Sequence, residues 1–259
     1  MELNNENYFS KEANIEYMSV SQYKNFLECP TMALALVNEQ YIPETKESYL
    51  EGKLFENIVT GNEILFMSKH PEMTSSKGAT AGQLKSNFKS VKNAADKFME
   101  QKLFMDIINK CDKQVILTGV INGVKIRGEL DLLDKETLNI YDIKCMSNFE
   151  DVWSKKDKAY IPWYYNYNYV LQLAVYQELV KQNFGKCGET FLIAATKEKI
   201  PDVCGLEISQ ESLNMVLDEF KFYAPMFDEI KKGERKPISC NCCDYCKTIK
   251  TIDRFEEVK

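Results

Sequence analysis

The pattern of apolar and polar positions divides the chain into a helical first part and a mixed second part. Residues 1–17 show no clear element, and we expect them to be flexible. A helix is predicted to begin near Ser19 or Ser21, with a break or bend at Pro30, and a second helix to stop at Gly61. The first part thus contains four segments, which are the helix 19–39, the helix 46–61, a loop rich in Ser and Gly at 67–82, and a helix at about 89–109.

The pattern changes to that of strands from residue 113 onward. Residues 113–145 combine alternating and continuous apolar runs, with the hairpin-turn pair Asn122-Gly123 and a second turn near Lys135. We therefore expect three consecutive antiparallel strands. The remaining elements are a long amphipathic helix at 167–185, strands at 189–198 and 202–209, and a helix at 210–233 interrupted near Pro225. This order predicts an α/β fold with a central mixed sheet flanked by helices.

Composition narrows the function classes. The chain has 259 residues and a net charge of -6, which argues against a protein that coats DNA nonspecifically but allows a local grip on DNA. Its single histidine, His70, argues against a catalytic triad or a multi-histidine metal site. No apolar run approaches the ~20 residues that cross a membrane. The polar N-terminus and the nine cysteines predict a reducing cytosol.

The segment GELDLLDKETLNIYDIKC, at residues 128–145, carries the candidate chemistry. Apolar residues crowd Asp131, so its carboxylate should lie against the core. In NIYDIKC, the period of two places Asp142 and Lys144 on one face together with Ile140. Two acids and a lysine on neighbouring strands can hold a hard divalent cation with an ammonium beside it, as metal-assisted phosphodiester hydrolysis requires. The alternative is a surface ion pair on a hairpin.

The order of elements and motifs resembles the PD-(D/E)XK nuclease superfamily in its RecB-like branch, in particular the RecE-type exonucleases of phages and prophages that are similar to exonuclease VIII. The resemblance runs from about Ser19 to Cys246. It implies a restriction-endonuclease-like core. The single nuclease domain that it predicts, residues 18–259, consists of a helical region at 18–110, a catalytic core at 111–232 and a cysteine cluster at 240–246.

The resemblance assigns catalytic roles to five residues. Asp131 and Asp142 take the two acidic positions and Lys144 the lysine of the strand motif, written here as DIK. In the next helix, Gln172 and Tyr176 match a Q-x-x-x-Y pattern. Lys144 would orient or deprotonate the attacking water or stabilise the transition state, Gln172 would position the substrate or the lysine, and Tyr176 would contact a phosphate or support the helix.

The resemblance also implies a metal site. Upstream, Gly52 and Glu56 match a glycine followed four residues later by a site residue that is more often histidine. Glutamate offers a hard oxygen ligand, so the departure bears mainly on metal preference. One or two Mg²⁺ or Mn²⁺ ions would be bound by Glu56, Asp131, Asp142 and the backbone carbonyl of Ile143.

The implied activity is a metal-dependent DNA exonuclease acting on the ends of linear double-stranded DNA. The resemblance further implies 5′-to-3′ polarity, delivery of single strands to a single-strand annealing recombinase, and a ring-shaped homo-oligomer. Two alternatives stay open. One is a DNA endonuclease or nickase, and the other is a catalytically degenerate nuclease fold that binds DNA or a protein.

Clustered cysteines near the C-terminus predict a second metal site. Cys240, Cys243 and Cys246 form a C-x-x-C-x-x-C series, a spacing that favours Zn²⁺ or an iron–sulfur cluster. The early segment SVSQYKNFLECP is similar to one in AddB-type and CRISPR adaptation nucleases, where an early cysteine joins three late ones around a [4Fe–4S] cluster. That similarity implies Cys29 as the fourth ligand. The choice between zinc and iron–sulfur stays open, as does the alternative of free cysteines on an exposed tail.

Two further features suggest contacts with DNA. Aromatic residues crowd positions 160–169 and could stack on unpaired bases, with Trp163 as the best candidate, or pack the connector onto its helix or a second subunit. Lys53 and other lysines of the helical region could contact phosphates, or they could form an ordinary solvated face.

Overall fold

The computed structural model describes residues 1–44, 46–154, 156–252 and 255. The chain divides into two compact units. The first unit is made of Met1–Pro43, Thr118–Arg127 and Asp218–Lys259, and the second is made of Glu44–Leu117 and Gly128–Leu217. The end of the domain expected at residue 259 lies outside the described residues, and the single domain stays a prediction.

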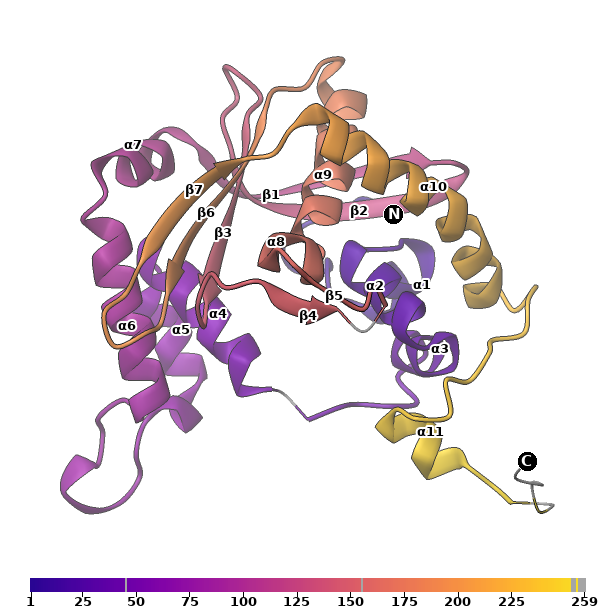
Figure 1. Ribbon diagram of the computed structural model, residues 1–259, viewed down its shortest axis with the longest axis horizontal. Helices are drawn as coiled ribbons and strands as arrows, with labels where there is room; N and C mark the ends of the chain where they lie inside the picture. The colour runs from indigo at the N-terminus through magenta and orange to yellow at the C-terminus, as the bar shows by residue number, and fades with distance from the viewer. Residues whose placement is uncertain (45, 155, 253–254, 256–259) are drawn as a thin grey trace. The chain divides into compact units, whose positions relative to one another are not determined.

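A five-stranded mixed sheet forms the centre of the fold, in the order β1-β2-β3-β6-β7 (Figure 1). Strands β2 and β3 are antiparallel, β3 and β6 are parallel, and β6 and β7 are antiparallel. The strands are β1 (Asp112–Ile121), β2 (Val124–Leu133), β3 (Ile140–Met146), β6 (Thr190–Thr196) and β7 (Val203–Glu207). The predicted α/β fold with three consecutive strands, a further helix and two more strands is confirmed.

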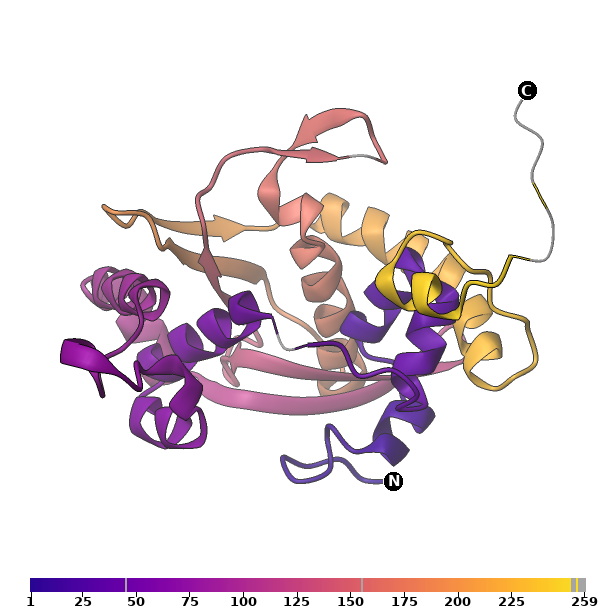
Figure 2. The same cartoon turned by 90° about the horizontal axis from the view of Figure 1, so that it is seen from below.

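Within the second unit, helices cover both faces of β3 and β6 (Figures 1 and 2). Helices α4 (Glu47–Val59) and α6 (Ser86–Met99) share a hydrophobic core with Ile143 and Ile193, while α9 (Tyr169–Phe184) contacts β3 and β6 from the other face. Parallel strands need such cover on both sides because both of their faces are buried. Side chains of β3 therefore alternate between two environments, and the even-numbered positions face α9.

The remaining elements of the second unit are short. They are α5 (Glu63–Lys69), α7 (Lys102–Lys110), α8 (Trp163–Asn166), and the separate hairpin of β4 (Val152–Ser154) and β5 (Ala159–Ile161). The helix expected at 89–109 is two helices, because the chain leaves the helical path after Met99 and α7 buries its own apolar side chains, Phe104 and Ile108. Part of the loop expected at 67–82 is instead the end of α5 and two 3₁₀ turns.

In the first unit, the predicted helix boundaries near Ser19 and Pro30 are confirmed. The Ser19 side chain accepts a hydrogen bond from Gln22 N at the start of α2 (Val20–Glu28), and Pro30 is the first residue of α3 (Pro30–Val37). Residues 1–17, expected to be flexible, contain α1 (Lys11–Glu16), and Ala13 is fully buried. The last helix of this unit is α11 (Asp244–Ile249).

The interruption expected near Pro225 is wrong, since α10 (Gln210–Lys231) continues through it. Proline lacks the N–H that would bond to the carbonyl of Lys221 four residues earlier. The side-chain amide of Asn122 supplies the missing donor, with Nδ2 2.8 Å from Lys221 O. Asn122 and Gly123 both have positive φ, as the predicted hairpin turn between β1 and β2 requires. One turn residue therefore closes the hairpin and supports the proline-containing helix.

In the described part of the chain, no helix is both long and apolar enough to span a lipid bilayer.

Candidate functional site

The two predicted aspartates lie on β2 and β3 where the pairing of these strands ends. The recorded pairs are Leu132 with Tyr141 and Leu133 with Ile140. Beyond them, Ile143 N donates to Oδ2 of Asp131 at 2.8 Å. The Asp131 side chain thus holds a backbone group of β3 and fixes its own carboxylate beside the strand that carries Asp142.

Lys144 brings the two carboxylates into one cluster. Its Nζ lies 2.5 Å from Asp142 Oδ2 and 3.7 Å from Asp131 Oδ2, and it donates to Ile143 O at 3.2 Å. The Asp142 side chain is fully buried. The structure therefore unites the predicted Asp131, Asp142, Ile143 carbonyl and Lys144, and the exposed ion pair considered as the alternative is excluded by this burial.

Burial sets the electrostatics of the cluster. Burial raises the pKa of Asp131 to about 6, against the opposing effect of Lys144 and with a further upward contribution from Asp142. Burial alone would lower the pKa of Lys144, but Asp142 and then Asp131 raise it above its usual value. Burial also raises the pKa of Glu129. Lys144 is therefore a permanent ammonium, and the largely buried Asp131 beside it is costly to keep charged.

Gln172 and Tyr176 complete the cluster from α9. Gln172 Nε2 donates to Asp142 Oδ1 at 3.0 Å and to the hydroxyl of Tyr176 at 3.2 Å. The Tyr176 ring packs against Gly128, where an added Cβ would lie 2.7 Å from Tyr176 Cε1. A glycine is thus needed on β2 for the tyrosine to reach the glutamine.

Glu56 is held by hydrogen bonds from two other side chains. Lys53 Nζ donates to its Oε2 at 2.8 Å, and Gln114 Nε2 donates to its Oε1 at 3.2 Å. Burial would lower the pKa of Lys53, but Glu56, and after it Asp131 and Glu129, raise it. Lys53 is thus bound to an acid and is not an open phosphate contact.

The carboxylates do not form a closed ligand set. In the described ranges, the cysteine group is the only set of three or more potential metal ligands whose donor atoms all lie within 4.8 Å of one another. The structure therefore does not bring Glu56 together with Asp131 and Asp142 at that spacing. Asp131 and Asp142 still offer the hard oxygens that Mg²⁺ and Mn²⁺ prefer. Asp142 Oδ2 is buried and lies 2.5 Å from the Lys144 ammonium, so this oxygen would share its charge between Lys144 and a bound cation.

Sequence reasoning missed two residues of this region. Lys144 Nζ lies 5.1 Å from the ring centroid of Tyr169, and Tyr169 precedes Gln172 by three residues on α9. That spacing places both on one helix face, a signal available from the sequence. Gln114 contacts Glu56 from β1 across 58 positions of sequence, and no local pattern indicates it.

The aromatic prediction needs a correction. Trp163 is only 4% exposed and stacks on Phe149 with ring centroids 5.4 Å apart, so its ring is not available to DNA bases. Two exposed aromatics lie together on the β4–β5 hairpin, where Trp153 is 50% and Tyr160 69% exposed, and Tyr167 of the predicted segment is 44% exposed. The rings of Trp153 and Tyr160 meet edge to face at 5.4 Å.

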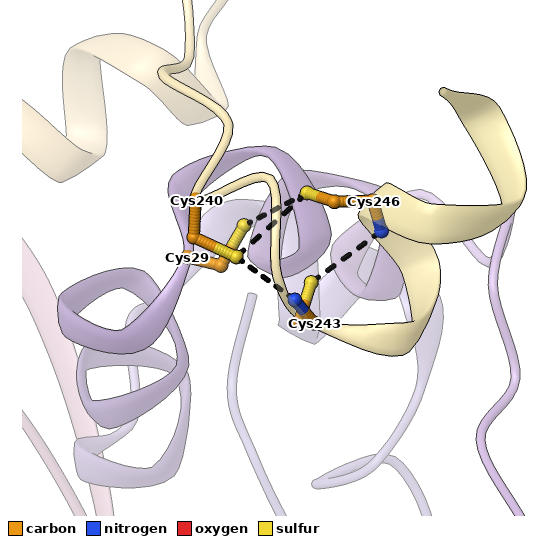
Figure 3. A group of neighbouring side chains, drawn as sticks. All are labelled: Cys29, Cys240, Cys243 and Cys246. Atoms are coloured by element: carbon orange, nitrogen blue, oxygen red, sulfur yellow. Dashed lines mark hydrogen bonds between the residues drawn. The ribbon is translucent and has the colours of Figure 1, made fainter. Parts of the chain in front are cut away.

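The four predicted cysteines of the first unit converge (Figure 3). Cys29, which joins α2 to α3, lies with Sγ 3.5 Å from Cys246 Sγ, and Cys240 Sγ lies 3.9 Å from Cys246 Sγ. Cys243 completes the group, whose sulfurs all lie within 4.8 Å of one another. This group can bind a metal ion or a cluster. It is not a set of free thiols on an exposed tail, because Cys29 and Cys246 are buried.

The mixed sheet with Asp131 on one strand and an Asp-x-Lys motif on the next defines a protein of the PD-(D/E)XK class. Residues 19–249 match a PDDEXK-like domain of unknown function (DUF3799), and the chain belongs to that family. The sequence matches none of the curated proteins with which it was compared.

Among solved structures, the chain is similar to a protein of Eubacterium rectale described as a candidate exonuclease. The two chains are 31% identical, the match covers 99% of this chain and 97% of the other, and the TM-score is 0.91. A phage-related exonuclease of Haemophilus somnus 129PT is 14% identical, and the match covers 78% of this chain and 95% of the other, with a TM-score of 0.33. That score is too low to support a structural conclusion. The predicted superfamily fold is confirmed.

Proposed function

We propose that the protein is a metal-dependent deoxyribonuclease that degrades linear double-stranded DNA from its ends. The observation that carries this proposal is the position of Lys144 Nζ, 2.5 Å from Asp142 and 3.7 Å from Asp131 inside a buried cluster. A purely structural ion pair would need one partner for the lysine, whereas this cluster contains an excess of buried negative charge. Support also comes from the Eubacterium rectale relative, which is described as a candidate exonuclease.

In this proposal Asp131, Asp142 and the Ile143 carbonyl hold one or two Mg²⁺ or Mn²⁺ ions. A bound divalent cation would supply the Lewis acid that stabilises charge on the scissile phosphate. The Lys144 ammonium donates a hydrogen bond to the attacking water or to a phosphate oxygen as negative charge develops there. Because burial keeps water from screening it, this donor is strong.

The residues of α9 act by positioning. Gln172 holds Asp142 Oδ1 and is itself held by the Tyr176 hydroxyl, so the carboxylate keeps one orientation through the reaction. Glu56, bound by Lys53 and Gln114, would serve a second cation or tune the charge of the site. Phosphate binding by Lys53 would require it to leave Glu56, so we assign Lys53 to the acid.

The finer features of the activity rest on the resemblance to RecE-type exonucleases. They are 5′-to-3′ polarity, a homo-oligomer around DNA, and transfer of the remaining strand to an annealing recombinase. The exposed Trp153 and Tyr160 replace Trp163 as the proposed base-stacking residues.

The test compares linear and covalently closed circular forms of one plasmid, each incubated with Mg²⁺, Mn²⁺ or EDTA. We expect metal-dependent loss of the linear form alone, and duplexes labelled at the 5′ or 3′ end then give the polarity. Cleavage of the circle would establish an endonuclease instead. Absence of cleavage with either metal would contradict catalysis and favour a DNA-binding or protein-binding module.

A further inference from the structure

The spacing of the four cysteine sulfurs distinguishes between the two kinds of metal centre that the sequence leaves open. All four sulfurs lie within 4.8 Å of one another, and two of their separations are 3.5 Å, from Cys29 to Cys246, and 3.9 Å, from Cys240 to Cys246 (Figure 3). Four thiolates around one tetrahedral zinc ion, each about 2.3 Å from the metal, are roughly 3.8 Å apart. The observed sulfurs therefore have the spacing of ligands around a single ion.

An iron–sulfur cubane needs a wider arrangement. Each cysteine binds a different iron at a corner of the cluster, so the irons and sulfides separate the four thiolates from one another. Sulfurs as close as those of Cys29 and Cys246 leave no room for a cluster between them. The protein would have to move the C-terminal segment outward to accept one.

The backbone around the cysteines also suits thiolate ligands. Met32 N donates to Cys29 Sγ at 3.5 Å, Cys243 N to Cys240 Sγ at 3.3 Å, and Cys246 N to Cys243 Sγ at 3.4 Å. Four thiolates around one dication carry an excess of negative charge, and N–H donors of this kind offset it. Each donor comes from three residues further along the chain, so the local turns that present the sulfurs also present the N–H groups.

We propose that Cys29, Cys240, Cys243 and Cys246 bind one zinc ion in a closed, four-coordinate structural site. The four thiols lose their protons to solvent when the ion binds. With all four positions filled by protein, the ion has no place for a substrate and takes no part in hydrolysis. It links the corner between α2 and α3 to α11, segments 217 positions apart in the sequence (Cys29 to Cys246). This proposal is independent of the nuclease activity.

The extra cysteine of the cluster provides a matched control. Cys242 lies between two ligands in the sequence but is exposed and is not a member of the group. We expect protein purified with and without oxygen to contain one zinc per chain by elemental analysis, with no iron, no acid-labile sulfide and no visible absorption. Cys242→Ser should keep the full zinc content, whereas Cys246→Ser should lose most of it.

If Cys246→Ser folds poorly, wild-type protein from which the metal has been removed provides a second test. Reloading with Co²⁺ should give the intense visible bands of a tetrahedral thiolate site, and reloading with Zn²⁺ should protect the segment from Lys232 to Lys250 against trypsin. Iron with acid-labile sulfide in the purified protein would overturn the proposal. The proposal would also be overturned if neither preparation contained metal, or if Cys242→Ser lost as much zinc as Cys246→Ser. The same holds if zinc did not change the tryptic digestion of the stripped wild-type protein.

Discussion

In β3, Lys144 Nζ lies 2.5 Å from Oδ2 of Asp142, two positions earlier on the same face of the strand. The other oxygen of Asp142 accepts from Gln172 Nε2 at 3.0 Å. The carboxylate is thus held by a cation from its own strand and by an amide from α9. Its orientation is fixed before any substrate arrives, which is what a metal-binding or catalytic carboxylate requires.

The hydrogen bond from Gln172 predicts a positioning effect. Gln172→Ala removes the donor to Asp142 and leaves the Tyr176 hydroxyl without this amide. We expect kcat to fall about 10- to 100-fold, as for other residues that orient metal ligands. The Mg²⁺ concentration that gives half-maximal activity should rise. Gln182→Ala, at an exposed bond with Glu178 on the same helix, should leave both values unchanged. Equal losses in the two variants would show that α9 is merely destabilised.

The packing of Tyr176 on Gly128 predicts opposite effects of one substitution at two glycines. Gly128→Ala places a Cβ 2.7 Å from the ring, and we expect a loss of about 1–3 kcal/mol in the free energy of unfolding. Gly52→Ala adds a methyl group inside α4 with no atom within 4 Å, and should stabilise the protein by about 0.5–1 kcal/mol. Urea unfolding measures both. A neutral Gly128→Ala would contradict the close contact.

The turn between β2 and β3 predicts a pH-dependent stability. Burial would raise the pKa of Asp134, but bonds from Lys110, Thr137 and the backbone of Glu136 lower it from 3.8 to about 2. Because the Asp134 carboxyl has a lower pKa in the folded state than in the unfolded state, its charge stabilises the fold fully at pH values above the unfolded-state pKa. This contribution is lost as the pH falls through the folded-state pKa.

Asp134→Asn should therefore cost about 1–2 kcal/mol of unfolding free energy at pH 7, because it removes hydrogen bonds to a charged group. The difference from wild type should narrow as the pH falls from about 4 towards 2. Urea unfolding at successive pH values measures this difference. A constant difference over that range would show that the carboxylate charge of Asp134 is not responsible.

Substitution of each tryptophan distinguishes a role in DNA contact from a role in core packing. Trp153→Ala removes an exposed ring of the β4–β5 hairpin, and we expect KM for DNA to rise about fivefold or more with unchanged stability, as for loss of a base-stacking side chain. Trp163→Ala removes a buried ring and should lower the free energy of unfolding by about 3–5 kcal/mol. Steady-state kinetics and thermal unfolding distinguish them. An unchanged KM for Trp153→Ala would show that the β4–β5 hairpin does not contribute to DNA binding.

Local spacing predicts much of this architecture. The period of two in NIYDIKC places Asp142 and Lys144 on one face, and Asn122-Gly123 specifies the hairpin, because both depend only on neighbouring residues. The four-residue interval places Gln172 and Tyr176 together on α9 for the same reason.

Features that depend on distant partners are not predictable in this way. The continuity of α10 through Pro225 depends on Asn122, more than 90 positions away, which supplies a donor to the carbonyl that proline leaves unpaired. Trp163 has the composition of a stacking residue, but Phe149 and its neighbours bury it. The sulfur spacing that favours zinc is equally absent from the sequence, since it depends on where Cys29 meets the C-terminal cysteines.

The most direct measurement is the rate at which acid-soluble nucleotides are released from linear duplex DNA with Mg²⁺, compared between wild type and Asp142→Asn. Asp131→Asn serves as a second variant, and Asp106→Asn, at an exposed position of α7, as the matched control. We predict metal-dependent release by wild type and by Asp106→Asn, and a loss on the order of 1,000-fold in each site variant that is still folded. Release that persists in folded Asp142→Asn and Asp131→Asn would contradict an active site at these carboxylates.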